Sequence, residues 1–315
     1  MILCIGTTPA AQRVMIFRKL VLDAVNRAVS TLDGAAGKSV NVAKVLKVLG
    51  EHPVATGFLG GDRGDFIRSA LKEKGIESEF VMVSARTRQC VTVIDESAGA
   101  HTELVEESGP VEPSDFDQLD EVVRRRLEGC RAVVMSGTLT PGGPVDLYAR
   151  FTRMANAAGA ISVVDAQGAA LMEALIASPG LVKPNRAEMA ATLECGLDDE
   201  AAVIKAMGEL HERGARRVVV TAGKEPALAF DGHCFWRILS PCITALNPIG
   251  SGDAFTAGLV SRLARGDDLG EACRWASAAG AANALSAMPG ELAVADVERL
   301  ARETRVERIQ KTAWR

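Results

Sequence analysis

Residues 247–255 read Asn-Pro-Ile-Gly-Ser-Gly-Asp-Ala-Phe, a polar turn rich in small residues that runs into the apolar stretch 256–264. The apolar stretch is typical of a buried helix, and the small residues before it let the backbone approach a ligand closely. Free amides at the start of such a helix form an anion site. Asp253 is the unusual member, because bound phosphate would repel its carboxylate. Either it is a base placed beside a phosphoryl group, or it is an ordinary first-turn residue of a capped helix.

The composition is that of an ordinary globular protein, and its 315 residues predict a single α/β domain over 1–315. A formal net charge of −4 predicts neither a nucleic-acid partner nor a membrane-surface partner. The seven cysteines never have CxxC spacing, which argues against a thiolate zinc site and indicates a reducing cytoplasm. We expect a cytoplasmic protein, since the sequence shows no signal-peptide pattern and no apolar run of membrane-spanning length.

Helical and strand-like patterns alternate along most of the chain. The first predicted elements are a strand at 2–5, a helix at 38–49, a strand at 54–58 and a helix at 65–74. Helices at 114–128, 144–157 and 198–212 then precede strands at 132–135, 161–164 and 217–220. A hairpin at 227–238 and helices at 252–265, 268–285 and 293–310 complete the chain. This alternation predicts an α/β fold with a doubly wound, mostly parallel sheet and helices on both faces.

Residues 79–106 have a different character. They contain three segments of alternating apolar and polar residues separated by turns, as in antiparallel strands. With a strand or hairpin near 13–22, they predict a small antiparallel sheet formed by about 13–35 and 79–106, in which 30–37 is a loop.

Charged side chains outside the motifs are expected to face water. Lys44 and Lys47 lie one turn apart on the predicted helix 38–49. The tail past Arg302 mixes arginine with glutamate, which is typical of a solvated helix face.

Five polar or glycine-containing loops follow predicted strands, at 136–138, 165–168, 183–188, 221–224 and 247–253. The carboxyl ends of parallel strands share one edge of a sheet, and open α/β proteins bind their ligands there. Two look-alike motifs fail on spacing. Leu32 stands where a P-loop ending at Gly37-Lys38-Ser39 needs glycine, and Phe255 stands at the third glycine position of a dinucleotide fingerprint.

Three stretches in family order resemble the ribokinase-type (PfkB) carbohydrate kinases, within them the branch of 1-phosphofructokinase and tagatose-6-phosphate kinase. They are Gly-Ala-Ala-Gly-Lys-Ser-Val-Asn-Val-Ala-Lys-Val-Leu-Lys at 34–47, Leu-Val-Lys-Pro-Asn-Arg-Ala-Glu at 181–188 and Gly-Ser-Gly-Asp at 250–253. Shorter matches at 57–60, 87–89 and 136–139 support them, so the resemblance covers nearly the whole chain. It implies a ribokinase-like fold in which the small sheet is a β lid.

The resemblance implies ATP-dependent phosphoryl transfer to a hydroxyl of a sugar phosphate of the fructose 1-phosphate or tagatose 6-phosphate type. It makes Asp253 the base that takes the proton of the acceptor hydroxyl. The amides of Gly250, Ser251 and Gly252, with that of Asp253, then form the anion hole for the transferring group. This assignment agrees with the chemistry, because phosphoryl transfer needs mainly positioning and charge stabilisation.

The cofactors implied are ATP and Mg²⁺. Lys183, Asn185 and Glu188 match the family's KPNxxE segment, implicated in triphosphate contact and in holding Mg²⁺ through water. An oxygen pair from Asn185 and Glu188 suits a metal that keeps several waters, although the same two residues also fit a helix-capping pair.

Thr221, Gly223 and Lys224 match the loop that approaches the nucleotide. Where the family commonly has a second glycine three residues after the first, this chain has Pro226, which has no amide to donate. Asn283 is a candidate for the adenine pocket, and a plain helix-surface residue is the alternative.

On the acceptor side, the resemblance implies that the Gly37 amide and the Asn41 side chain bind sugar hydroxyls, with Ser136 also at the substrate. Lys38 and Arg88 would meet an acceptor phosphate, since a cationic pair suits a dianion. Gln12 stands where the phosphosugar branch usually has an Asp that grips sugar hydroxyls, which changes both charge and hydrogen-bond polarity.

The expected partners are a small sugar or sugar phosphate and a second copy of the chain, paired through the β lid. Two other functions stay open. One is a ribokinase-type kinase of an unphosphorylated sugar, sugar acid or nucleoside, and the other is a non-catalytic binding or regulatory protein, suggested by Gln12 and Pro226.

Overall fold

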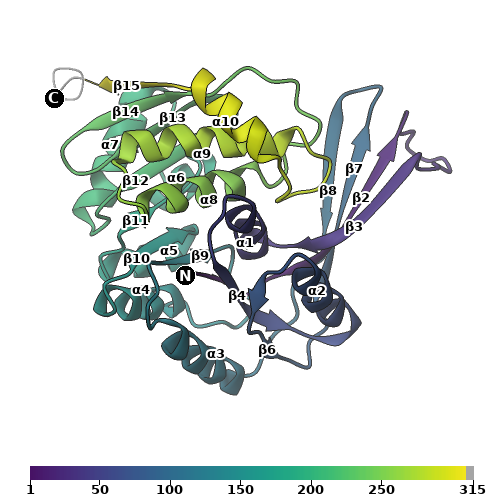
Figure 1. Ribbon diagram of the computed structural model, residues 1–315, viewed down its shortest axis with the longest axis horizontal. Helices are drawn as coiled ribbons and strands as arrows, with labels where there is room; N and C mark the ends of the chain where they lie inside the picture. The colour runs from purple at the N-terminus through teal and green to yellow at the C-terminus, as the bar shows by residue number, and fades with distance from the viewer. Residues whose placement is uncertain (310–315) are drawn as a thin grey trace.

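A mostly parallel sheet runs through the middle of the molecule in the computed structural model, which describes residues 1–309 (Figure 1). Within these residues the sheet has 11 strands in the order β15-β14-β13-β12-β11-β10-β9-β1-β4-β5, and β6 pairs with the end of β4. The strands are β1 Ile2–Gly6, β4 Pro53–Leu59, β5 Glu77–Ser78, β6 Val81–Met82, β9 Ala132–Ser136, β10 Ile161–Asp165, β11 Leu181–Val182, β12 Val218–Ala222, β13 Glu225–Phe230, β14 Phe235–Leu239 and β15 Arg305–Ile309. The doubly wound α/β architecture predicted from the alternating pattern is confirmed.

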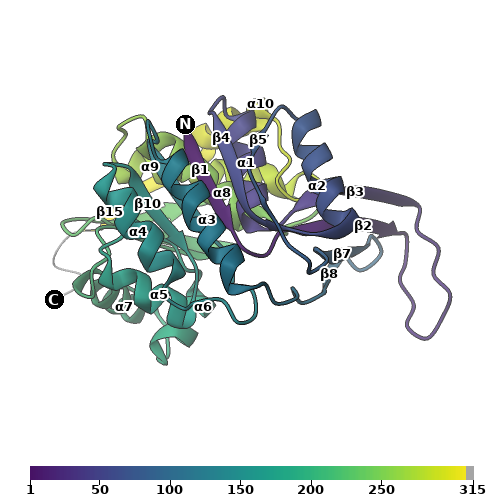
Figure 2. The same cartoon turned by 90° about the horizontal axis from the view of Figure 1, so that it is seen from below.

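Helices cover both faces of this sheet (Figures 1 and 2). One face carries α3 Pro113–Arg126, α4 Leu147–Ala157, α5 Gly168–Ile176, α6 Arg186–Leu193 and α7 Glu200–Glu212. The other carries α1 Lys38–Val48, α2 Gly61–Glu73, α8 Ser251–Leu263 and α9 Leu269–Ala284, with α10 Val294–Glu303 packed on α9.

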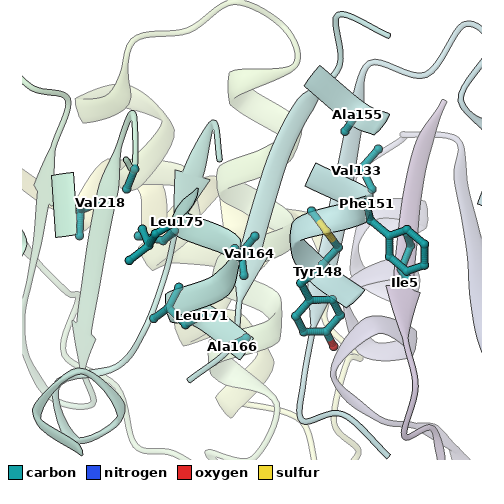
Figure 3. Packing of buried hydrophobic residues seen from close by; sticks show 14 of the residues in the cluster. Ile5, Val133, Tyr148, Phe151, Ala155, Val164, Ala166, Leu171, Leu175 and Val218 are labelled. Atoms are coloured by element: carbon teal, nitrogen blue, oxygen red, sulfur yellow. The ribbon is translucent and has the colours of Figure 1, made fainter. Parts of the chain in front are cut away.

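Strand β1 shows why the sheet is covered on both faces. All five of its residues are buried, and successive side chains point to opposite faces. Ile5 joins the cluster with α3 and α4, where Figure 3 shows it close to Val133 and Phe151, whereas Cys4 joins the cluster with α1 and α8. A strand that is apolar at every position is typical of a central parallel strand.

A second sheet, the lid, projects from the body (Figures 1 and 2). It has the order β3-β2-β7-β8 and consists of β2 Ala10–Phe17, β3 Ser30–Ala36, β7 Arg88–Asp95 and β8 Ala100–Val105. Its two outer pairs are antiparallel, while β2 and β7 run parallel. A contact of 2.5 Å between His101 Nε2 of β8 and the Leu246 carbonyl joins the lid to the loop before α8.

The lid differs from the prediction at two places. Residues 30–36 form a strand rather than a loop, because all of them pair with β2, from Ser30 opposite Ile16 to Ala36 opposite Ala10. Residues 81–82 belong to the main sheet, where they extend the pairing of β4 at Phe58 and Leu59.

The C-terminal helix predicted at 293–310 ends at Glu303, and this prediction is wrong beyond that point. Thr304 has extended backbone angles, after which β15 pairs antiparallel with β14 and covers its edge. The Arg237–Glu307 ion pair of 3.2 Å links the two strands, so residues 304–309 are not a helix face. Residue 310 of the predicted helix lies outside the described residues. Among residues 1–309, no helix has the length and apolarity needed to cross a membrane.

Candidate active site

A cavity of about 470 Å³ lies where the loops after the parallel strands meet the lid. Twelve of the predicted site residues line it: Gln12, Gly37, Lys38, Asn41, Arg88, Lys183, Asn185, Glu188, Thr221, Gly250, Gly252 and Asp253. Ser136, Ser251, Gly223, Lys224 and Asn283 are not among its lining residues. The cavity therefore brings together predicted site residues that are up to 241 positions apart, from Gln12 to Asp253.

Asp253 lies in the first turn of α8 and is buried. Its Oδ2 accepts a hydrogen bond of 2.8 Å from Asn41 Nδ2. Burial raises the pKa of Asp253 to about 6, although the positive charge of Lys38 and the Asn41 hydrogen bond act against this rise. A carboxylate with this pKa is ionised at neutral pH and is still a useful base.

The turn before α8 is shaped by Gly250, which caps the helix with a φ of 84°. A side chain there would be strained and would meet Pro289, only 2.8 Å from the position of an added Cβ. The amide of Ala254 makes the first helical bond, to the Gly250 carbonyl at 2.9 Å, while the Ser251 amide donates to Pro248 at 3.1 Å. The first-turn amides of Gly252 and Asp253 are thus left without a helical acceptor.

Two buried asparagines hold this turn in place. Asn247 Nδ2 donates to the Ala287 carbonyl at 2.7 Å. Asn283 donates from Nδ2 to the Ile249 carbonyl at 3.0 Å and accepts from the Gly290 amide at 2.7 Å. Asn283 is fully buried, so the helix-surface alternative is wrong, and its amide supports the turn instead.

Asp165 is a central residue of the site, although the sequence predicted only that the loop 165–168 lies at the ligand-binding edge and gave Asp165 no role of its own. It ends β10 and is 1% exposed. Its Oδ1 lies 3.3 Å from Lys38 Nζ, and its Oδ2 lies 3.1 Å from Lys183 Nζ and 2.9 Å from Thr256 Oγ1. Burial alone would raise the pKa of Asp165, but the charges of Lys183 and Lys38 outweigh burial and lower it. It is therefore an anion held between two cations.

Asn185 and Glu188 form the capping box at the start of α6. Asn185 Oδ1 accepts from the Glu188 amide at 2.8 Å, and Glu188 Oε2 accepts from the Asn185 amide at 2.8 Å. The helix-capping role of Asn185 and Glu188 is therefore confirmed. It leaves Glu188 Oε1 facing the cavity, 3.2 Å from Lys38 Nζ.

These carboxylates fit a divalent metal held mainly through water. Asp165 Oδ1 and Glu188 Oε1 already converge on one cation, the ammonium of Lys38, and both are hard oxygen donors of the kind Mg²⁺ prefers. Residues 1–309 contain no group of three or more His, Cys, Asp or Glu that could hold a metal. Mg²⁺ would thus depend on water and on nucleotide phosphates for most of its ligands.

The lid supplies the other wall. Gln12 is buried and donates from Nε2 to Thr92 Oγ1 at 2.9 Å. Arg88 donates from Nε to the Thr8 carbonyl at 3.2 Å, which fixes the root of its guanidinium at the cavity. Cys90 and Glu103 also line the cavity and were missed, because in the sequence they read as ordinary residues of alternating strands. Burial raises the pKa of Glu103, with Arg88 acting against it.

The nucleotide loop is more open. Thr221 lines the cavity, whereas Gly223 and Lys224 form the exposed tip of the β12–β13 hairpin. Pro226 lies within β13 and lines a separate hollow of about 150 Å³. Ser136 is buried at the end of β9, and Gly137 and Thr138 after it line the cavity.

Lys44 does not face water as predicted. It is 2% exposed, and its Nζ donates to the carbonyls of Pro289 at 2.6 Å and Ala35 at 3.1 Å. Burial lowers its pKa to about 8. The helical period places this residue under the loop that carries Pro289, whereas Lys47 is exposed as expected.

Residues 1–292 match the pfkB family carbohydrate kinases, so the chain belongs to this family and is a phosphotransferase. Membership of a kinase family implies ATP as a substrate. A tagatose-6-phosphate kinase from Staphylococcus epidermidis is 30% identical over 295 residues, covering 93% of this chain and 94% of the relative.

Two solved structures share the fold. Phosphofructokinase-2 from Escherichia coli, in complex with substrates and products, matches with a TM-score of 0.89 at 27% identity, covering 96% of this chain and 98% of that one. A Thermotoga maritima protein described as a possible 1-phosphofructokinase matches with a TM-score of 0.91 at 24% identity, covering 98% and 100%. The ribokinase-like fold predicted from the sequence is confirmed.

Proposed function

We propose that this chain transfers the γ-phosphoryl group of ATP to a hydroxyl of a sugar phosphate, of the fructose 1-phosphate or tagatose 6-phosphate type. One observation carries the proposal: the buried carboxylate of Asp253 lies in the first turn of α8 and lines the same cavity as Arg88 of the lid. A base at a helix start suits phosphoryl transfer, and a guanidinium in the same cavity suits an acceptor that is already phosphorylated.

Asp253 acts as the base in this proposal. As the acceptor oxygen bonds to the γ-phosphorus, the bond between that phosphorus and the bridging oxygen of ATP breaks, ADP leaves, and Asp253 takes the hydroxyl proton. The amides of Gly252 and Asp253 stabilise the charge of the transferring group, with Gly250 shaping the turn. Closure of the lid would exclude water and suppress hydrolysis of ATP.

The nucleotide lies along the loops after β11 and β12 in this proposal. Lys183, Asn185 and Thr221 line this part of the cavity, and Gly223 and Lys224 follow Thr221 at the exposed tip of the β12–β13 hairpin. Asp165 and Glu188 would hold Mg²⁺ through water, and the bound ion would neutralise phosphate charge.

The acceptor lies against the lid, between Gly37, Gln12 and Arg88. Because the amide nitrogen of Gln12 is engaged by Thr92, its carbonyl oxygen is left to accept from a sugar hydroxyl. Gln12 can thus accept the same hydrogen bond as the Asp usual in this branch, without the negative charge. The name of the Staphylococcus epidermidis relative, tagatose-6-phosphate kinase, supports a phosphorylated acceptor.

An acceptor panel tests the proposal. ADP release with ATP and Mg²⁺ is measured for fructose 1-phosphate, tagatose 6-phosphate and fructose 6-phosphate, each beside its free sugar, with ribose added. We expect the kcat/KM of one phosphosugar to exceed that of its free sugar by about 100-fold. This factor is the loss expected when the free sugar cannot make the charged hydrogen bond of the phosphate. Turnover of free sugars alone would favour the ribokinase-type alternative, and no turnover above acceptor-free hydrolysis would contradict both.

We also propose a homodimer paired through the lid. Leu22 and Val25, between β2 and β3, are 88% and 83% exposed, and Leu104 and Val105 of β8 are exposed as well. Apolar side chains on an edge-bearing sheet are typical of an interface between copies. Sedimentation should give a dimer that Leu104→Asp weakens, and a wild-type monomer at micromolar concentration would contradict this.

A further inference from the structure

We propose that Lys38 is the resident counter-ion of the metal position, occupying it in the metal-free protein and giving it up when a divalent cation binds. This inference rests on the proposed function, because it concerns how the kinase site is prepared for Mg²⁺. Its basis is the placement of one ammonium between two carboxylates from different elements: Lys38 Nζ lies 3.3 Å from Asp165 Oδ1 and 3.2 Å from Glu188 Oε1.

The two lysines that hold Asp165 are not equivalent. The Lys183 side chain is 3% exposed, and it lies 3.1 Å from Oδ2, on the side of Asp165 that Thr256 also contacts. The Lys38 side chain is 37% exposed and is the first residue of α1, so it borders open cavity. Lys183 is therefore a fixed partner of Asp165, whereas Lys38 has room to leave.

The charges of the site explain why Lys38 can leave its position only when another cation takes its place. With all groups ionised, Asp165, Glu188 and Asp253 carry three negative charges against two positive charges from Lys38 and Lys183. Moving Lys38 away without another cation would take from Glu188 its ion-pair partner and leave the buried Asp165 with Lys183 alone, which is unfavourable. An ammonium and a divalent cation cannot share the gap between the same two oxygens, because they repel at that distance. Metal entry and Lys38 release are thus one exchange.

The exchange assigns Lys38 two positions. In the metal-free protein it neutralises Asp165 and Glu188, and its positive charge also acts against the rise that burial causes in the pKa of Asp253. Once displaced, its ammonium is free within the cavity that Arg88 also lines, where it can meet phosphate oxygens. A phosphate-binding cation then becomes available only when the metal has arrived.

Divalent-ion binding without nucleotide tests this exchange. Mn²⁺ is titrated into the full chain, and the free ion is followed by electron paramagnetic resonance. We expect Lys38→Met to bind one Mn²⁺ per chain about fivefold more tightly than the wild type, since the ion pairs of Lys38 with Asp165 and Glu188 no longer compete with the metal. Lys47→Met, which removes the same charge from the exposed side of α1, should match the wild type.

A second variant locates the bound ion. The gain in Mn²⁺ affinity should vanish in the double variant Lys38→Met/Glu188→Gln, because one of the two carboxylates that bind the ion is then uncharged. Unchanged Mn²⁺ affinity in Lys38→Met, or a gain that survives Glu188→Gln, would overturn the proposal. If Lys38→Met does not fold, Lys38→Gln replaces it, and the same gain in Mn²⁺ affinity is expected. These outcomes are independent of the acceptor panel, so a failed kinase assay and a failed exchange are told apart.

Discussion

Asn41 Nδ2 donates a hydrogen bond of 2.8 Å to Asp253 Oδ2, joining the first helix of the chain to the first turn of α8 across 212 residues of sequence. The bond occupies one carboxylate oxygen and leaves the other for an acceptor hydroxyl. It also favours the charged form of Asp253, against the burial that raises its pKa. The sequence predicts that Asn41 binds a sugar hydroxyl. In the structure it is placed to orient the proposed base and to favour its ionised form.

The activity should depend on the protonation of Asp253. The pKa of Asp253 is raised to about 6, so the base is protonated below that value and ionised above it. The kcat/KM for the acceptor should rise about tenfold per pH unit below pH 6 and level off above it. Initial rates between pH 5 and 8 measure this limb. A flat profile through pH 6 would argue against a carboxylate base with this pKa.

Asn41→Leu should shift the rising part of this pH–rate profile to higher pH. Leucine has nearly the same volume but donates no hydrogen bond, so the charged form of Asp253 loses its support. A hydrogen bond to a charged group contributes about 1.5–3 kcal/mol, which corresponds to a rise in pKa of at least about one unit. The pH–rate profile is the readout, because a general loss of structure would lower the plateau without shifting the limb.

Arg88→Ala should weaken a phosphorylated acceptor specifically. Losing a charge-assisted contact of about 1.5–3 kcal/mol raises the acceptor KM about 10- to 100-fold, while the KM for ATP stays unchanged. Arg86→Ala is the matched control, since Arg86 is nearby, exposed and paired with Asp62 at 2.7 Å. Equal effects of the two substitutions would show that Arg88 does not contact the acceptor.

Lys44 should leave a signature in the pH dependence of stability. Its folded pKa of about 8 lies below its ordinary value of 10.5, so the unfolded chain holds the proton more tightly. The cost of burying the charge is fully present below pH 8 and is relieved as pH rises towards 10.5. The free energy of unfolding of the wild type, relative to Lys44→Met, should increase by roughly 2–3 kcal/mol between pH 7.5 and 10.

Urea unfolding at the two pH values measures this difference, which cancels groups that titrate alike in both proteins. Lys47→Met should follow the wild type, because Lys47 is exposed. Parallel pH dependences for the wild type and Lys44→Met would mean that Lys44 is not buried as a charge.

Much of the fold was accessible from local pattern. Apolar runs such as Ile2–Gly6 and amphipathic helices such as α7 show their period within a few residues, so strand-helix alternation predicts the doubly wound sheet. β15 was missed because its strand character depends on the edge of β14, which is 66 residues earlier. Lys44 was missed because its burial depends on Pro289, far along the chain.

The site shows the same division. Short motifs predicted most cavity-lining residues, including Asp253, Lys183 and Glu188. Asp165 is not part of such a motif. Its role in the site depends on Lys38 and Lys183, which tertiary folding places beside it. Glu103 and Cys90 face the cavity only because of the register of β7 and β8, which a sequence read strand by strand does not give.

Asp253→Asn is the most direct measurement of the central claim. The substitution keeps size and can still hydrogen-bond Asn41, but it removes the base. With the best acceptor from the panel at pH 7.5, kcat should fall about 10²- to 10⁴-fold, which corresponds to about 3–5 kcal/mol, with the KM for ATP and the unfolding midpoint nearly unchanged. Near-normal turnover by Asp253→Asn would contradict the account, since Asp253 would then not be needed to take the acceptor proton.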